Sequence, residues 1–225
     1  MNRQVVVRMV VVLFALLGLS LFPLKAQKIY ATDTETGEKT FVLTYGWGIT
    51  GYASSHGISA WDVDGKGGGV ANLLKAMCYS SSSEVGYGGL LYGNTHSQRF
   101  QAEGVKERVN LIYVAPQVSY LKRATMFPSC FSTMGGGVGY LHYRSKTALS
   151  GHPDDIKVSA SSAGVNGFIG FEYTFARHWG ISLEVDALYS PVKLGKGGRE
   201  PVPFKPRGKL GLFLLTTQIG LSCHL

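Results

Sequence analysis

Hydrophobic and polar residues alternate along the last segment of the chain, residues 209–225. Odd positions such as Phe213 and Ile219 are mostly apolar, whereas even positions such as Thr216 and Gln218 are mostly small or polar. Successive side chains of a β-strand point to opposite faces. The segment is therefore predicted to be a strand with one apolar face and one polar face.

The same two-residue period recurs upstream and predicts seven further strands. They cover residues 41–52, 70–79, 84–95, 108–121, 130–144, 158–175 and 179–190. In 70–79 neither face is uniformly apolar, so a short helix over 71–77 is the alternative there. Pro116 falls inside the segment 108–121, and we expect a β-bulge at this position because proline cannot donate a ladder hydrogen bond.

An apolar face on every strand is typical of a barrel embedded in a membrane, with lipid outside and a polar lumen. After residue 26 no stretch approaches the roughly 18 apolar residues that a membrane-spanning helix needs. Only helices and closed barrels satisfy all their backbone groups inside a bilayer. We therefore predict an all-β fold, an eight-stranded antiparallel up-and-down transmembrane β-barrel.

The connections between the predicted strands alternate in length. Those after the second, fourth and sixth strands are short, and those after the other strands are long, including 96–107 and 145–157. Outer-membrane barrels have short periplasmic turns and longer external loops. The alternation predicts that the long connections share one side of the membrane.

The N-terminus carries a different pattern. Arg3 and Arg8 accompany an apolar run over residues 5–22, and the small residue Ala26 follows it. This order is typical of a secretory signal peptide, here cleaved after Ala26, with an uncleaved membrane anchor as the alternative. The predicted organisation is a signal peptide over 1–26, a short polar lead-in over 27–39 and one barrel domain over 40–225.

Charge narrows the classes of partner. The formal net charge of the whole chain is +8. Removal of Arg3, Arg8 and Lys25 with the signal peptide leaves 19 basic residues (22 minus 3) against 14 acidic ones, a net charge of +5. This excess is modest, so we do not expect nucleic-acid binding.

The three cysteines are Cys78, Cys130 and Cys223, and no two of them have the spacing of metal ligands. Free cysteine behaves as a small apolar residue, and this is the role we expect. A disulfide between Cys78 and Cys223 is the alternative in an oxidising compartment. No metal ion or other cofactor is expected.

Three short stretches resemble strands of the small outer-membrane β-barrel domain of Gram-negative bacteria, the OmpA/OmpX-like group. They are residues 114–120 (VAPQVSY), 137–143 (GVGYLHY) and 170–173 (GFEY). The resemblance runs from about residue 40 to the end of the chain and implies an outer-membrane location. It also implies recognition by the barrel-insertion machinery. Barrels of this group commonly end in an aromatic residue, and Leu225 takes that position here.

The polar faces of the predicted strands carry ionisable residues. We expect Glu84, Glu172, Glu184 and Asp186 in the lumen, with Lys75 and Arg144 as their partners. Side chains just fill an eight-stranded barrel, and an isolated buried charge is costly. We therefore expect a network of ion pairs and hydrogen bonds that stiffens the barrel, with a small-solute pore as the alternative.

Catalysis is the second alternative. A hydrolase of the nucleophile–base type needs a serine, a base and an orienting carboxylate within hydrogen-bond reach. The best set in the sequence is His142, Ser145 and Glu172, which lacks the tight His-x-Ser pattern of the lipid A deacylases. We expect a non-enzymatic protein with an envelope-structural or surface-interaction role, and a lipid A-modifying barrel enzyme is the alternative.

The predicted loop over 191–207 is basic. Its cationic residues are Lys193, Lys196, Arg199, Lys205 and Arg207. Cationic side chains bind phosphate oxygens through charge-assisted hydrogen bonds, so this rim is a candidate contact for lipopolysaccharide, with a merely solvated loop as the alternative. Outer-membrane lipid and lipopolysaccharide are the expected partners.

Overall fold

The structure is a computed structural model that describes residues 39–52, 68–80, 83–100, 105–124, 127, 129–149, 156–176, 178–193 and 209–225. The strands are β1 (Lys39–Tyr52), β2 (Gly68–Ser80), β3 (Val85–Phe100), β4 (Val105–Arg123), β5 (Cys130–Leu149), β6 (Ile156–Ala176), β7 (Trp179–Lys193) and β8 (Lys209–His224). The predicted signal peptide and all of the lead-in before Lys39 lie outside the described residues.

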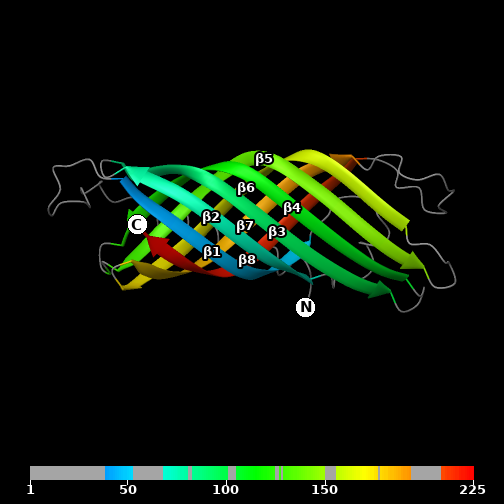
Figure 1. Cartoon of the computed structure of the whole chain (residues 1–225), viewed down its shortest axis with the longest axis horizontal. Helices are drawn as coiled ribbons and strands as arrows, with labels where there is room; N and C mark the ends of the chain where they lie inside the picture. The colour runs from blue at the N-terminus through cyan, green and yellow to red at the C-terminus, as the bar shows by residue number, and fades with distance from the viewer. Residues whose placement is uncertain are drawn as a thin grey trace, which may run out of the picture. The chain divides into compact units, whose positions relative to one another are not determined.

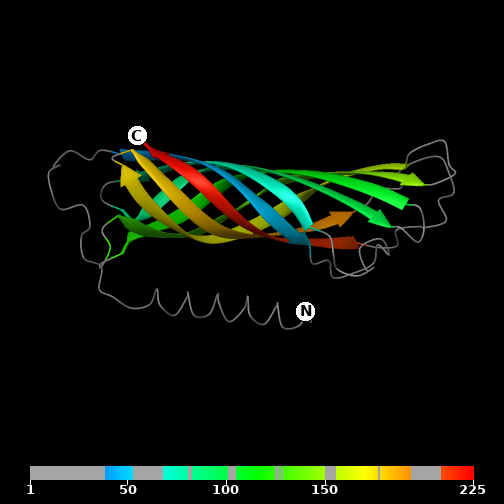
Figure 2. The ribbon, with the colours of Figure 1, turned by 90° about the horizontal axis from the view of Figure 1, so that it is seen from below.

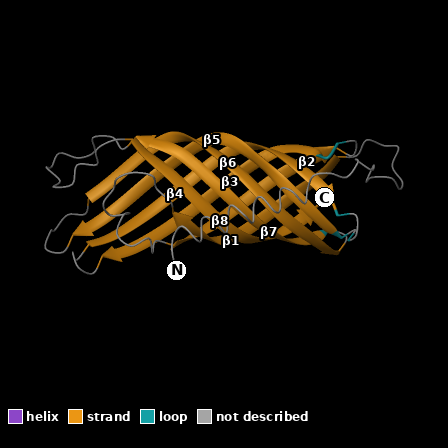
Figure 3. Ribbon diagram, turned by 180° about the vertical axis from the view of Figure 1, so that it is seen from behind, coloured by secondary structure: helices purple, strands orange, loops and turns teal. Residues whose placement is uncertain are grey.

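The eight strands form one closed barrel in chain order, and every neighbouring pair is antiparallel (Figure 1). β1 pairs with both β2 and β8, so the sheet has closed on itself. The prediction of an eight-stranded antiparallel up-and-down barrel is confirmed. Figure 3 shows strands and short connections throughout the described part of the chain. Among the described residues, no helix is long and apolar enough to cross a membrane.

The register gives the barrel its tilt. Paired positions can be followed from Val42 around all eight strands to Tyr52, through Met77, Gly88, Gln117, Gly137, Asn166, Leu188 and Leu214. The shear is therefore ten residues (52 minus 42). For eight strands this corresponds to a tilt of about 40° from the barrel axis, within the usual range for closed barrels.

The outside of the barrel is a belt of exposed apolar side chains. On β7 the exposed residues include Trp179, Ile181 and Leu183, which are 44–52% exposed, and on β8 they include Ile219 at 61%. The alternate positions of these strands, such as Glu184, are buried inside the barrel. Apolar side chains in this number on the outer surface fit a lipid surrounding rather than water.

The segment 70–79 is a strand rather than the alternative helix. It lies within β2, which pairs along its length with β1 and β3. Odd positions of β2 point inward, so Lys75 is 5% exposed and lies in the lumen. The irregular pattern has a physical reason, because the inward face here holds both apolar residues such as Leu73 and the charged Lys75.

The barrel has two distinguishable ends. β1 begins and β8 ends at one of them, which we call the turn end, and the opposite end is the loop end. The strands β3 to β6 extend farther towards the loop end than β1 and β2 do, as Figure 2 shows. Much of the expected loops 96–107 and 145–157 is therefore strand, and only residues 101–104 and 150–155 lie between the strands there.

The predicted alternation of short and long connections was therefore wrong for the connections after β3 and β5. These two hairpins are built from long strands, and their connections are as short as those at the turn end. A four-stranded sheet of β3 to β6 thus projects at the loop end. We call it the projecting sheet.

The bulge expected at Pro116 is absent. Val114 pairs with Tyr140 and Gln117 pairs with Gly137, so the β4–β5 register is the same on both sides of the proline. Pro116 faces outward and keeps its partner Gly89 on β3. The ladder to β5 omits only the positions of Ala115 and Pro116, which is how the missing N–H is accommodated.

Candidate functional site

The interior of the barrel is filled by side chains arranged in layers. A small apolar cluster closes the turn end, made of Val42, Met77, Tyr79 and Leu121 with Phe131 packed against it. A charged and amide-rich layer follows in the middle of the barrel. An apolar core follows towards the loop end, with the buried Asn94, His96 and Ser145 beyond it, so the lumen is less polar than the sequence pattern predicted.

The middle layer is centred on an ion pair across the lumen. Lys75 Nζ on β2 lies 2.5 Å from Oε2 of Glu184 on β7, and both side chains are at most 10% exposed. Gln218 Nε2 donates a hydrogen bond of 2.8 Å to the other carboxylate oxygen of Glu184. The ammonium group also lies over the ring of Phe168, 3.3 Å from its centroid. The cation is thereby held by a carboxylate and an aromatic face at once.

Asp186 belongs to a second polar group in the same layer. Asn166 Nδ2 donates to Asp186 Oδ2 at 3.1 Å, and Asn166 Oδ1 accepts from Gln117 Nε2 at 2.8 Å. The hydroxyl of Tyr113 also donates to Asn166 Oδ1 at 3.2 Å. The amide side chains of Asn166 and Gln117 therefore extend the hydrogen-bond network of the buried Asp186 carboxylate from β7 through β6 to β4.

The loop half of the lumen is an apolar core. Its members come from seven strands: Ala71, Leu73, Leu90, Tyr92, Val109, Leu111, Tyr113, Ala115, Leu141, Tyr143, Ala160, Leu188, Leu212 and Leu214. A continuous water channel would expose its lining, whereas Val109, Tyr113, Leu141 and Leu214 are 0% exposed. Three hydroxyls inside this core bond to one another, with Thr50, Tyr92 and Thr216 at 2.8–3.1 Å.

Glu172 lies apart from the middle layer, at the turn end. Its Oε1 contacts Nε2 of His224, and the carbonyl of His224 is 2.8 Å from Nδ1 of His178. Gly180 lies beneath this carboxylate, because a Cβ on Gly180 would be only 2.5 Å from Glu172 Oε1. The last residues of β8 are thus tied to β6 and to the β6–β7 turn.

Two of the expected lumen residues lie elsewhere. Glu84 precedes β3 at the turn end and accepts a hydrogen bond from the hydroxyl of Tyr120, whose side chain is on the outward face of β4. Arg144 is exposed on the outward face of β5, between the buried Tyr143 and Ser145. The expectation that both face the lumen was wrong. In contrast, the structure places Lys75, Glu172, Glu184 and Asp186 inside the barrel.

The candidate catalytic set is not assembled. Ser145 is 4% exposed and points inward, whereas His142 belongs to the outward face of the same strand. Ser145 pairs with Val158, and Glu172 lies 14 positions farther along β6, which is about 46 Å of extended chain. His142 Nδ1 instead lies 3.0 Å from Oγ of Ser161 on β6, on the outside.

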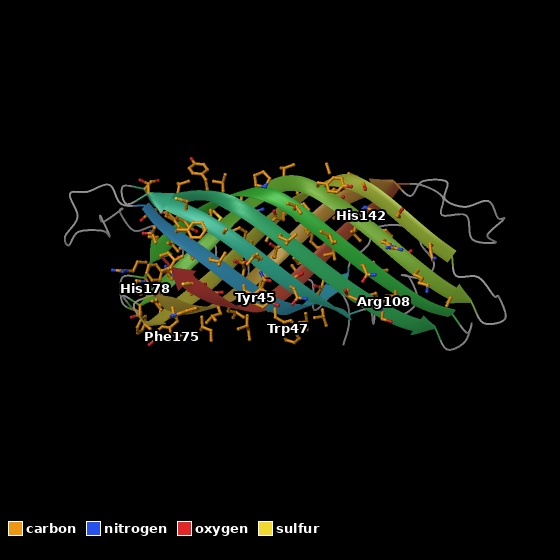
Figure 4. The ribbon with its side chains drawn as sticks, in the orientation of Figure 1. Tyr45, Trp47, Arg108, His142, Phe175 and His178 are labelled. Carbon is orange, nitrogen blue, oxygen red and sulfur yellow. The ribbon has the colours of Figure 1, made fainter. Side chains whose placement is uncertain are left out.

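The basic rim predicted in the last loop lies almost wholly outside the described residues. Lys196, Arg199, Lys205 and Arg207 lie outside the described residues, and only the backbone of Lys193 belongs to β7. The described residues do show other cations near the loop end, such as Arg108 and Lys146. Figure 4 shows Arg108 and His142 towards that end of the barrel, and Phe175 and His178 at the turn end.

Sequence reasoning did not assign Arg144, Lys146 and Lys157 to the outward face of the projecting sheet, because it ended one strand at residue 144 and began the next at residue 158, whereas β5 and β6 extend farther. The signal was present: Leu141, Tyr143 and Ser145 point inward, so the even positions from His142 to Lys146 share the outward face. If the predicted strand 130–144 is continued by a few residues with the same alternation, these outward positions are identified. Within the described residues, no group of three or more His, Cys, Asp or Glu side chains is placed to hold a metal ion.

Several solved structures share this architecture. Neisserial surface protein A (NspA) aligns over 82% of this chain and 96% of its own, with 11% identity and a TM-score of 0.54. Ail, the attachment invasion locus protein of Yersinia pestis, in complex with the heparin analogue sucrose octasulfate, covers 84% and 99%, with 12% identity and a TM-score of 0.52. OprG of Pseudomonas aeruginosa covers 84% and 97%, with 14% identity and a TM-score of 0.51. The chain has the fold of the small outer-membrane β-barrels of the OmpA/OmpX-like group.

This fold and the apolar belt together place the chain in the outer membrane. Outer-membrane barrels have short periplasmic turns and longer external loops. The two long connections, after β1 and β7, are at the loop end, so we expect the turn end to face the periplasm and the loop end to face outward. No protein-family model matches the chain, and no curated protein sequence is significantly similar to it. At 11–14% identity the likeness concerns the fold, and function has to be argued from the residues.

Proposed function

We propose that this outer-membrane barrel is non-enzymatic, stiffens the envelope and presents its projecting sheet for contacts at the cell surface. The proposal rests on two features seen together, a lumen filled by side chains and an extended edge of the projecting sheet. The described core residues of the loop half are buried, which supports a lumen closed to solutes. The projecting sheet is therefore the remaining candidate for a surface that contacts other molecules.

The edge of the projecting sheet is formed by β6. This strand pairs with β5 from Ile156 to Tyr173, but its ladder with β7 begins only at Val165. Two residues before Val165, a side chain still links the strands, because Ser190 Oγ on β7 donates a hydrogen bond of 2.7 Å to the backbone carbonyl of Ala163 on β6. The backbone of residues 156–161 is outside the β7 ladder and so resembles the strand edges to which other proteins add a strand.

The test uses cells that express the intact protein, a shortened variant or neither. In the shortened variant, residues 97–108 and 145–158 are each replaced by a short turn, so that the barrel keeps its lipid-facing strands. Heat-modified gel migration checks that both forms fold. We expect the intact protein to increase attachment of the cells to one another or to host surfaces, and the shortened variant to lose this gain. Equal attachment of cells with and without the intact protein would remove the proposal.

A lipid A-modifying activity has one observation in its favour, the outward pair of His142 and Ser161. Tyr140 also donates to Ser161 Oγ at 2.6 Å, so the hydroxyl is already bonded on two sides. Among the described residues, the neighbouring positions on this face are Ile112, Arg144 and Ser159, and none is a carboxylate that would orient the histidine. We expect the lipid A mass spectrum to be the same with wild type, H142A and S161A.

A further inference from the structure

The outward face of the projecting sheet is organised in rungs across β4, β5 and β6. The first rung is Ile112, His142 and Ser161, the second is Asn110, Arg144 and Ser159, and the third is Arg108, Lys146 and Lys157. Each rung consists of directly paired residues that face the same side of the sheet. We call the four cations of the second and third rungs, Arg108, Arg144, Lys146 and Lys157, the basic face.

The basic face begins where the lipid-facing belt ends. The rung below the first consists of Val114, Tyr140 and Ala163, and all three are exposed on the outside of the barrel. Polarity therefore changes along one continuous surface, from apolar side chains through His142 and Ser161 to arginine and then lysine.

All four cations are exposed, and they are close together. Adjacent strands lie about 4.8 Å apart and alternate residues about 7 Å apart, so the four backbone positions fit in an area of about 10 by 7 Å. The other members of their two rungs are Asn110 and Ser159, and the flanking β3 positions are Thr95 and Ser97. These side chains supply hydrogen-bond donors and no negative charge.

We propose that the basic face binds the phosphate groups of lipopolysaccharide in the outer leaflet. Arginine guanidinium groups pair with phosphate in a planar bidentate geometry, and lysine adds a mobile point charge. Below the phosphates, the amide of Asn110 and the imidazole of His142 lie at the height of the sugar hydroxyls. The acyl chains pack on the exposed Ile112 and Tyr140.

The position of the basic face favours a phosphorylated lipid over a soluble polyanion as the ligand. An extracellular polyanion needs only the charges, whereas a phosphorylated lipid also needs an apolar surface directly beneath them. Both are present on the same three strands. This inference depends on the barrel lying in the membrane. Its substitutions leave the backbone edge of β6 in place, whereas the shortened variant removes both that edge and three of the four cations, so the two tests separate the two roles.

The test measures lipid binding by the folded full chain in detergent with native mass spectrometry. The probes are bis-phosphorylated lipid A and the same lipid A after removal of its phosphates. The variant is R108Q/R144Q/K146Q/K157Q, which removes four positive charges. The matched control is K196Q/R199Q/K205Q/R207Q, which removes four positive charges from the last loop. Heat-modified gel migration verifies that each protein is folded.

We expect wild type to prefer the phosphorylated lipid by at least about tenfold, since charge-assisted bonds to phosphate are the strong ones. The basic-face variant should lose this preference and the loop control should keep it. The proposal is overturned if the basic-face variant keeps the preference, or if both variants lose it equally, because net charge alone would then be responsible. It is also overturned if wild type does not distinguish the two lipids.

Discussion

Lys75 and Glu184 form an ion pair across the lumen, with 2.5 Å between Nζ and Oε2, although their strands are separated by β8 and β1. The pair is buried below the apolar core of the loop half. Both residues have additional contacts, since Gln218 donates to Glu184 and the ring of Phe168 lies beneath the ammonium. The pair therefore joins opposite walls of the barrel.

The first prediction concerns this pair. Lys75→Met removes the cation and leaves the Glu184 carboxylate buried without its counter-charge, which typically costs about 3 kcal/mol or more. We expect a lower free energy of unfolding in urea for the barrel in lipid vesicles. The double variant K75M/E184Q removes the orphaned charge and should recover most of the loss. Wild-type stability of K75M alone would show that the pair contributes nothing.

The second prediction concerns conductance. The apolar core of the loop half is separate from the ion pair, so both wild type and K75M/E184Q should show no steady current in planar bilayers. Side chains in a barrel of eight strands are expected to fill the bore, and Leu141 and Tyr113 are 0% exposed in this one. Stable single-channel steps from the wild-type protein would contradict the filled lumen and revive the pore alternative.

The lipid-facing exterior and four of the lumen charges were predictable from the sequence, and the apolar core of the interior was not. Lipid strongly disfavours charged side chains, so the strand face of segment 179–190 that carries Glu184 and Asp186 had to point into the lumen. The interior accepts polar and apolar side chains alike, provided that they pack and pair. Leu111 and Leu141 therefore look ordinary in the sequence, and their assembly into one core depends on a register that only the closed barrel defines.

The ends of the strands were the other failure. Beyond the membrane both faces of a sheet meet water or packed protein, so alternation weakens although the strand continues. Residues 96–100 and 145–149 read as loops for this reason. The consequence was functional, because Lys146 and Lys157 were not recognised and Arg144 was assigned to the lumen. The positions of His142 and Ser145 on opposite faces follow directly from strand parity.

The third prediction concerns the close approach of Glu172 to Gly180 at the turn end. A Cβ on Gly180 would lie 2.5 Å from Glu172 Oε1, the atom that contacts His224. Gly180→Ala should therefore displace the carboxylate from His224 and destabilise the barrel by about 1–3 kcal/mol, as overpacking does. Gly93→Ala is the control, because its Cβ would meet nothing within 4 Å. Equal stability of the two variants in urea would disprove the role of Gly180.

The fourth prediction concerns the cysteines. Cys78 pairs with Phe41 and Cys223 pairs with Leu43, so β1 lies between the two cysteines. Two strand spacings and the two-residue offset from Phe41 to Leu43 put their Cα atoms about 12 Å apart, beyond the roughly 7 Å that a disulfide tolerates. The disulfide considered from the sequence is therefore not formed, and all three cysteines are free in the structure.

Alkylation of the purified protein under denaturing conditions without a reducing agent should modify Cys78, Cys130 and Cys223 alike. Prior reduction should add no further label. The matched control is C130S, which should lose one label and keep the other two, because Cys130 lies on β5, away from the other cysteines. A wild-type protein that takes up label on Cys78 and Cys223 only after reduction would show that the β1–β2 and β1–β8 registers are wrong, since both place β1 between these residues.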